Sequence, residues 1–221
     1  TSAVKNIEFL RNCISLNITP AWLFLYAIPG ENLEAYVDMM KFLPSLIHLP
    51  PPFEFTRIAI QRFSLFFQKP EKFNIRHIKP LDEYQYIFPQ TADISKLAIY
   101  FAGDYQTIED MGNITNNFHK YIQSWQQQYR IKRPLLHIVI LSPFYSFIID
   151  TRKIEVQYKL LSLNEFTIIE FLMEPKNEKE VECFIKEHSL QDELSSLLQE
   201  QTIMRIGGRY ISLPTDHYRE Y

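Results

Sequence analysis

Four side chains within the first 62 residues have the chemistry that a catalytic or ligand-binding site needs: Glu31, His48, Arg57 and Arg62. Glu31 follows a Pro-Gly turn at the start of a predicted helix, where a carboxylate either stabilises the helix dipole or faces a ligand. His48 lies between two apolar residues, a setting typical of a hydrogen-bonded structural histidine. No second histidine or carboxylate stands at metal-ligand spacing from His48, so the sequence predicts no metal site.

A predicted strand, turn and helix position the first of these residues. The run Ala21–Ile28 is apolar and aromatic, with the length of a buried strand. It ends at Pro29-Gly30, where proline fixes φ and glycine permits a tight turn. Apolar residues then recur at helical spacing over Glu31–Leu43, and Arg57–Phe63 is predicted to form a second strand. In such βα units, ligands usually bind at the loop that follows the strand.

Three stretches of this region, Trp22–Glu31, Pro44–Pro52 and Arg57–Ser64, resemble one enzyme family. It comprises the radical SAM enzymes that mature ribosomally made peptides, in the group whose members also carry a cobalamin-binding domain. That family reads W-x-L-L-Y-G-F-P-G-E, then H-L-x-P-P, then a strand ending D-R-F-S-P-Y-F. The chain departs from this pattern by placing Ala27, Gln61 and Leu65 where the family has glycine, aspartate and proline.

The resemblance implies a fold and a cofactor site. Residues 1–101 would be the C-terminal part of a radical SAM (β/α) barrel, which makes this half α/β. The full-length enzyme would use S-adenosylmethionine (SAM), a [4Fe–4S] cluster and cobalamin, and would perform chemistry such as C-methylation of a peptide. Separately, reduced thiols and the lack of an export signal in the sequence predict the cytoplasm. No catalytic residue is assigned. The residues that the resemblance places at the cofactor or substrate are Tyr26, Pro29, Gly30, Glu31, Arg62 and Ser64.

The cysteine count limits what this chain does alone. A cluster of this class takes three thiolates from a C-x3-C-x2-C loop, and the chain has two cysteines, Cys13 and Cys183, far apart in sequence. Both lie on apolar helical stripes and are predicted to be packing residues. We therefore expect this chain alone to bind none of the three cofactors. It would be either the C-terminal part of a longer enzyme or a remnant that lost catalysis.

Composition excludes several other classes of protein. The chain has 221 residues, of which 46% are hydrophobic, enough for a buried core and too many for a disordered chain. A net charge of −3 gives no electrostatic reason to expect nucleic acid, and no apolar run is long enough to span a membrane. A barrel fragment exposes a sheet edge, so either a second copy of the chain or missing N-terminal domains would cover it.

The second half predicts a different module, residues 135–221, after a connecting helix and linker at 102–134. Strands are predicted at 136–141, 145–150 and 155–161, with turns at Ser142-Pro143 and 151–153. Helices with start signals follow at Ser162-x-x-Glu165, Asn177-x-x-Glu180 and Ser189-x-x-Asp192. Gly207-Gly208 then predicts a two-residue hairpin. Together these elements indicate an α+β, winged-helix-like domain.

This module resembles the PqqD-like domains that hold a leader peptide as an added strand. The resemblance implies a precursor peptide as partner, bound beside the third strand and against the third helix. Candidate contacts are Val156, Tyr158, Leu160, Leu190, Leu194 and Leu197. A DNA-binding role is disfavoured because residues 190–200 carry acidic side chains and no Lys or Arg. A non-catalytic peptide-binding adaptor remains the alternative to a fragment of an enzyme, and a transcription regulator ranks third.

Overall fold

The computed structural model describes residues 2–107, 113–142 and 144–216, and mixes helices with small sheets. Spatial contacts divide the chain into two units. Unit 1 comprises Thr1–Ala21, Phe42–Pro51 and Ser124–Tyr221, and unit 2 comprises Trp22–Lys41 and Pro52–Gln123. The units therefore interleave in sequence, whereas the predicted domains 1–101, 102–134 and 135–221 are contiguous.

The first sheet of unit 2 is a parallel pair. Strands β1 (Leu23–Tyr26) and β2 (Glu54–Arg57) align Leu23 with Glu54 and Tyr26 with Arg57. Helix α2 (Leu33–Phe42) lies in the connection between them and is followed by the 3-10 helix η1 (Leu43–Leu46). This is the predicted strand–turn–helix unit, but over the described residues its sheet has two strands and forms no barrel.

The predicted second strand, 57–63, is wrong in its position. Strand β2 ends at Arg57, and the next strand, β3, covers only Ile60–Gln61. The backbone of Phe63 has a φ of 70°, in the left-handed region that an extended strand does not use. The apolar alternation in this stretch was too weak to show that the chain turns here and joins another sheet.

An aromatic cluster forms the core between the first sheet and the helix α6 (Ile114–Ile131). Within unit 2, the Phe118 ring of α6 lies 5.2 Å from the Phe24 ring and 5.4 Å from the Phe55 ring, measured between centroids. Tyr36 from α2 meets Phe118 edge to face at 5.4 Å. Such aromatic contacts hold helix and sheet together through area and ring geometry.

The second sheet of unit 2 has the order β3-β5-β4, with β4 at Arg76–Pro80 and β5 at Tyr100–Asp104. Its buried core consists of Ile60, Ile75, Ala98 and Phe101. Short helices surround it: α3 (Leu65–Gln68), η2 (Pro70–Phe73), α4 (Tyr84–Ile87) and α5 (Ile94–Leu97).

Unit 1 contains an antiparallel sheet of three strands, β6 (Leu136–Ser142), β7 (Tyr145–Asp150) and β8 (Gln157–Leu161), in that spatial order. The three predicted strands are confirmed, with the third starting two residues later than expected. Half of the predicted turn at Ser142-Pro143 lies outside the described residues. On the other edge, β6 pairs with Thr215, whose backbone N–H donates to the carbonyl of Leu136 at 2.9 Å.

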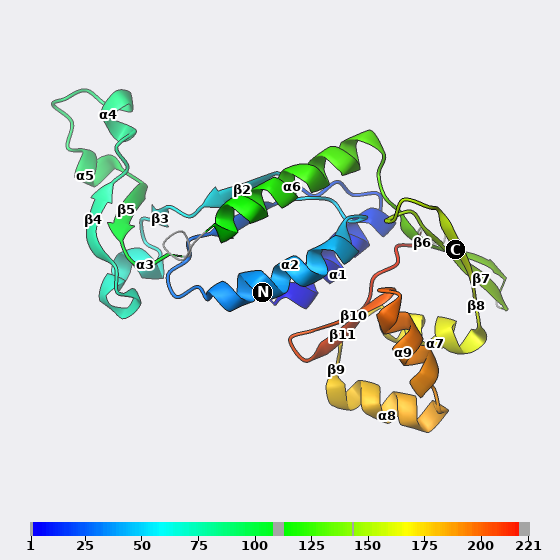
Figure 1. Ribbon diagram of the computed structural model, residues 1–221. Helices are drawn as coiled ribbons and strands as arrows, with labels where there is room; N and C mark the ends of the chain where they lie inside the picture. Colours follow the sequence, from blue (N-terminus) through cyan, green and yellow to red (C-terminus); the bar gives the residue numbers. More distant parts are fainter. Residues whose placement is uncertain (1, 108–112, 143, 217–221) are drawn as a thin grey trace. The chain divides into compact units, whose positions relative to one another are not determined.

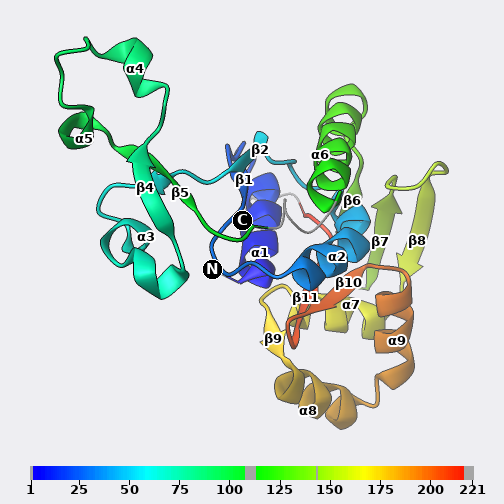
Figure 2. The ribbon, with the colours of Figure 1, turned by 60° about the vertical axis from the view of Figure 1, so that its left-hand side comes forward.

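Helices and a hairpin follow this sheet and lie together in both ribbon views (Figures 1 and 2). The hairpin turns at Gly207-Gly208, whose φ values of 55° and 71° require glycine-type backbone. Its second strand pairs with a short strand between the first two helices, so the sheet order is β10-β11-β9. The elements are α7 (Leu163–Phe171), β9 (Lys176–Asn177), α8 (Glu178–His188), α9 (Gln191–Gln199), β10 (Ile203–Ile206) and β11 (Arg209–Ser212).

Two of the three predicted helix starts are confirmed. Ser162 and Asn177 each form a capping box, with Glu165 and Glu180 respectively. Ser189 does not cap the start of a helix. It adopts a φ of 55° as the C-terminal cap of α8, and α9 begins after Leu190 with no side-chain cap. The left-handed backbone of Ser189 ends one helix, so its hydroxyl is not placed to start the next.

Buried polar side chains tie distant segments of unit 1 together. Arg11 of helix α1 (Ala3–Ser15) is 1% exposed and donates hydrogen bonds to the carbonyls of Ser212, at 2.6 Å, and Met173. Arg152 pairs with Asp150 at 2.7 Å and donates to the carbonyl of Ser45 at 2.9 Å. These bonds satisfy carbonyl groups that burial would otherwise leave without a partner.

Candidate functional site

Four of the candidate residues lie at the end of β1 or in the turn that follows it: Tyr26, Pro29, Gly30 and Glu31. Ala27, immediately after the strand, is fully buried and has a φ of 57°. This left-handed conformation costs an alanine about 1–2 kcal/mol, whereas glycine adopts it freely. The hydroxyl of Tyr105 donates to the Ala27 carbonyl at 2.7 Å and holds the turn.

Glu31 retains an unused acceptor in this turn. Tyr36 donates its hydroxyl to one carboxylate oxygen of Glu31 at 2.6 Å. Burial, and then the contact with Glu31, raises the pKa of the Tyr36 phenol, so it stays a donor. The second oxygen of Glu31 is buried and has no hydrogen-bond partner in the described part of the chain. It could accept a hydrogen bond from a ligand.

Arg62 and Ser64, the other two predicted cofactor residues, lie with the second sheet of unit 2 and are occupied there. Arg62 donates to the carbonyls of Ala98, at 2.6 Å, and Ser95, at 2.5 Å, and its guanidinium lies 4.9 Å from the centre of the Phe101 ring. Ser64 caps helix α3 by accepting from its backbone. Both side chains are therefore engaged by neighbouring segments of unit 2, Arg62 by two carbonyls and Ser64 by the start of α3.

Tyr26 and His48 also have structural partners. The ring of Tyr26 stacks on Phe55 at 4.5 Å and belongs to the aromatic cluster. His48 is buried, and its Nε2 donates to the carbonyl of Leu213 at 3.0 Å. Burial, and then the nearby Arg152 cation, lowers the pKa of His48 to about 3. The ring is therefore neutral near pH 7, as a structural histidine.

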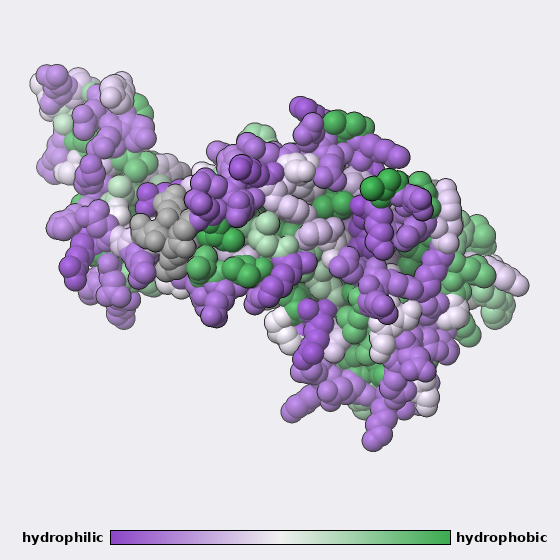
Figure 3. Space-filling model, viewed as in Figure 1, coloured by the Kyte–Doolittle hydropathy of each residue, from purple (hydrophilic) through white to green (hydrophobic). Residues whose placement is uncertain are grey.

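The second candidate site is the outer strand of the unit 1 sheet. Strand β8 pairs with β7 along one edge, and no other described strand pairs with its second edge. Tyr158 and Leu160 alternate along it and are 71% and 67% exposed, and Val156, just before the strand, is 44% exposed. In the space-filling view, apolar surface extends over the outer strands of this sheet (Figure 3). An open edge with exposed apolar side chains can accept a further strand.

The opposite face of β8 is fixed by charge, which the sequence did not reveal. The ammonium of Lys159 lies 2.6 Å from carboxylate oxygens of both Glu165 and Glu200. Burial opposes the charged form of Lys159, but the hydrogen bonds that its ammonium donates to Glu165 and Glu200 raise its pKa. Lys159 thus ties β8 to the start of α7 and the end of α9, so the exposed residues of β8 keep a defined orientation.

A groove of about 370 Å³ runs beside this strand. It lies between β8 and the segment that joins α9 to β10. Its lining residues are Ile148, Asp150, Lys153, Gln157, Tyr158, Lys159, Glu200 and Thr202. The groove can therefore receive side chains of a segment that lies along β8.

The peptide contacts that were predicted on the third helix are much less accessible to a ligand than the exposed residues of β8. Leu190 and Leu197 are 3% and 0% exposed and belong to the core, and Leu194 is half-buried. Their apolar spacing reflects packing of α9 within unit 1. The wall of the groove comes instead from Glu200 and Thr202, beyond the helix.

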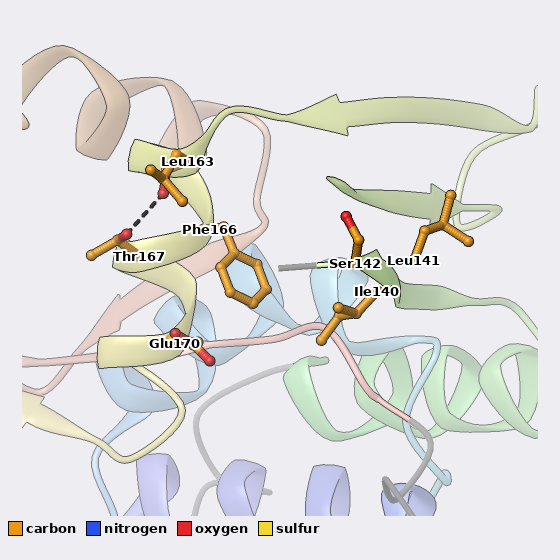
Figure 4. Close-up of a pocket in the computed structure, with 7 residues that line it drawn as sticks. All are labelled: Ile140, Leu141, Ser142, Leu163, Phe166, Thr167 and Glu170. Atoms are coloured by element: carbon orange, nitrogen blue, oxygen red, sulfur yellow. Dashed lines mark hydrogen bonds between the residues drawn. The ribbon is translucent and has the colours of Figure 1, made fainter. Parts of the chain in front are cut away.

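A second cleft, of about 510 Å³, lies at the other edge of the same sheet. Figure 4 shows Phe166 of α7 and Ile140 of β6 pointing toward one another across it. Leu141, Ser142, Leu163, Thr167 and Glu170 complete the lining. Thr167 donates to the Leu163 carbonyl at 2.8 Å, so its hydroxyl is engaged within the helix. The cleft can accept an apolar side chain, but its strand is partly paired with Thr215.

Among the described residues, no group of three or more His, Cys, Asp or Glu side chains could hold a metal ion. No helix in that part of the chain has the length and apolar character needed to cross a bilayer. Neither a protein-family model, nor a curated protein, nor a solved structure matches this chain.

Proposed function

We propose that this chain binds a peptide in an extended conformation, as an added strand on the open edge of β8. The observation that carries the proposal is the combination of that open edge with the outward alternation of Tyr158 and Leu160. In strand addition, backbone hydrogen bonds supply affinity, and alternate side chains supply specificity. Lys159, bonded to the body of the unit, keeps the edge in place for this purpose.

We further propose that residues 135–216 form a winged-helix-like module of the PqqD-like kind. Support comes from the order of elements: a three-stranded antiparallel sheet, then α7, β9, α8, α9 and the hairpin β10–β11. The short strand β9 pairs with β11, so the hairpin is joined to the segment between α7 and α8. The partner would then be the leader region of a precursor peptide.

A peptide suits the module better than DNA. The third helix, α9, carries Asp192 and Glu193 in its first turn and no basic residue in its last. Phosphates would be repelled by these carboxylates. The chain's formal charge of −3 gives no compensating attraction.

The resemblance to peptide-modifying radical SAM enzymes gives the proposed setting for this binding. Ala27 supports it, because the structure requires glycine-type backbone where the family pattern has glycine. The free oxygen of Glu31 fits a hydrogen-bond donor on SAM. The two cysteines, Cys13 buried and Cys183 exposed, do not fit a [4Fe–4S] cluster. Cluster and cobalamin chemistry on a peptide, such as C-methylation, would belong to other residues of a longer cytoplasmic enzyme.

Selection from a displayed library of random peptides tests the binding proposal. The strongest binder is then added to the protein, and hydrogen exchange is followed by mass spectrometry. We expect those backbone amides of β8 (Gln157–Leu161) that point away from β7 to become protected, because an added strand accepts hydrogen bonds from them. Protection confined to α7 and the end of β6 would place the peptide in the second cleft instead and overturn the proposal.

A matched pair of variants separates the two clefts. Leu160 on β8 and Leu163 at the second cleft are both exposed leucines, at 67% and 62%. Leu160→Lys puts a charge on the proposed binding edge and is expected to weaken the selected peptide at least about tenfold, whereas Leu163→Lys leaves binding unchanged. The reverse pattern, or failure to select any peptide, would refute binding at β8.

The enzymatic setting is tested separately by reading the coding sequence upstream of Thr1. We expect a C-x3-C-x2-C motif there, and iron and SAM cleavage in the protein expressed with that segment. A reading frame without the motif would leave the non-catalytic peptide-binding adaptor as the function. The β8 experiments would be unaffected by either result.

A further inference from the structure

A basic pocket adjoins the end of the proposed peptide groove. It has a volume of about 410 Å³ and lies between the last turns of α6 and the turn after β7, all within unit 1. Its lining residues are Gln127, Gln128, Ile131, Lys132, Pro134, Thr151, Arg152, Lys153 and Ile154. None of these residues is acidic, so the pocket presents positive charge and amide groups.

Two of the three cations in this lining are available to a ligand. Arg152 is neutralised by Asp150, with which it forms hydrogen bonds at 2.7 and 3.0 Å. Lys132 and Lys153 are exposed, and neither forms an ion pair within the part of the chain that the structure describes. Lys132 also follows the carbonyl end of α6, where a cation is favourable. That role does not account for Lys153, which comes from the β7–β8 turn.

The pocket is continuous with the groove along β8, because Lys153 lines both. The other charged side chains of the groove already have partners: Lys159 pairs with Glu200, and Asp150 pairs with Arg152. Among the described residues that line the groove and the pocket, the charges without an ion pair are therefore those of Lys132 and Lys153, at one end, beside the start of β8. If a peptide lies along β8, the side chains at one end of the peptide would therefore contact this positive charge.

We propose that the peptide bound along β8 carries an aspartate or glutamate at this end, and that Lys132 and Lys153 bind its carboxylate. This inference rests on the proposed function and specifies the chemistry of the partner. The glutamine amides of the pocket can donate further hydrogen bonds to the same carboxylate. The partner is then an amphipathic strand with apolar residues over Tyr158 and Leu160 and an acidic residue beyond them.

The selected library peptides provide the first test. We expect them to share alternating apolar residues and an excess of Asp or Glu at one end. The double variant Lys132→Gln/Lys153→Gln should weaken the best peptide about three- to tenfold, and added salt should remove most of this difference. The matched control is Lys179→Gln/Lys186→Gln, which makes the same charge change on exposed lysines of α8, outside both pockets.

A double-mutant cycle locates the contact. Replacing the acidic residue of the peptide by its amide should weaken binding to the wild-type protein by the same factor, and should have little further effect on the double variant. Equal losses in the control, or selected peptides without acidic residues, would overturn this inference while β8 binding stands. If Leu160→Lys has no effect on the same peptide, the proposed function fails first.

Discussion

The ammonium of Lys159 lies 2.6 Å from the carboxylate of Glu200, so the outer strand β8 is bonded to the end of α9. Glu165, which also caps α7, takes part in the same cluster. An edge strand is the part of a sheet most prone to fraying, because one side lacks backbone partners. Here a side-chain cluster compensates on one face and leaves the other face exposed.

Replacing Lys159 by methionine should loosen this edge. The change leaves Glu165 without its cationic partner, and we expect the free energy of unfolding to fall by roughly 1–2 kcal/mol, since the cluster is only partly buried. Urea unfolding measures the loss, and hydrogen exchange should quicken at β8 before the rest of the sheet. Lys41→Met removes an exposed pair with Asp38 and should cost less than about 1 kcal/mol. Equal losses in both variants would contradict the role given to Lys159.

His48 makes the stability of unit 1 depend on pH. Its pKa is about 3 in the folded protein, below the value near 6.5 of an unfolded chain. The unfolded state therefore binds the proton first as the pH falls. The contribution of His48 is complete above pH ~6.5 and is lost progressively toward pH ~3, so about 2 kcal/mol should disappear between pH ~7 and pH ~5.

Urea unfolding at these two pH values checks the prediction. His48→Asn keeps a donor for the Leu213 carbonyl but has no titrating ring. It should be less stable than the wild type near neutral pH and should lose about 2 kcal/mol less on acidification. Identical losses in the two proteins would show that other groups carry the pH dependence.

Local signals allowed much of unit 1 to be predicted. The capping boxes at Ser162 and Asn177 and the glycine pair at Gly207-Gly208 each set a backbone conformation within a few residues, and each is confirmed. Ser189 has the same sequence signal as the two caps but is used differently, because the preceding helix needs a left-handed residue at its end. A short motif does not show which of two neighbouring helices it serves.

Contacts between distant residues explain what the sequence did not predict. Lys159 and Glu200 are 41 residues apart, and no periodic pattern links them. The exposure of Tyr158 and Leu160 was compatible with the alternation of a strand, but the same pattern fits a buried face, so the structure was needed to show that this edge is open. Leu190 and Leu197 show the converse, with equally plausible spacing and complete burial.

Arg11 should be among the most sensitive residues of unit 1. Its guanidinium is buried and is bonded to the carbonyls of Ser212 and Met173. Arg11→Met leaves both acceptors without a donor, and we expect a loss of about 2–4 kcal/mol in the free energy of unfolding. Lys5→Met on the exposed side of the same helix, where Lys5 pairs with Glu8, should cost less than about 1 kcal/mol. Chemical denaturation of the two variants measures both free energies of unfolding. Similar losses in the two would contradict the structural role given to Arg11.

Ala27 tests whether the turn after β1 needs the backbone freedom of glycine. Ala27→Gly removes a left-handed alanine, a gain of about 1 kcal/mol, but also deletes one buried methyl group, a loss of about 0.8 kcal/mol. The melting temperature should therefore change little. Ala27→Val adds bulk at a fully buried position and a β-branched side chain at a φ of 57°, so it should destabilise unit 2 by at least about 2 kcal/mol. If valine were tolerated as well as glycine, the turn would have to adopt another conformation, and its likeness to the glycine position of the family would lose its physical basis.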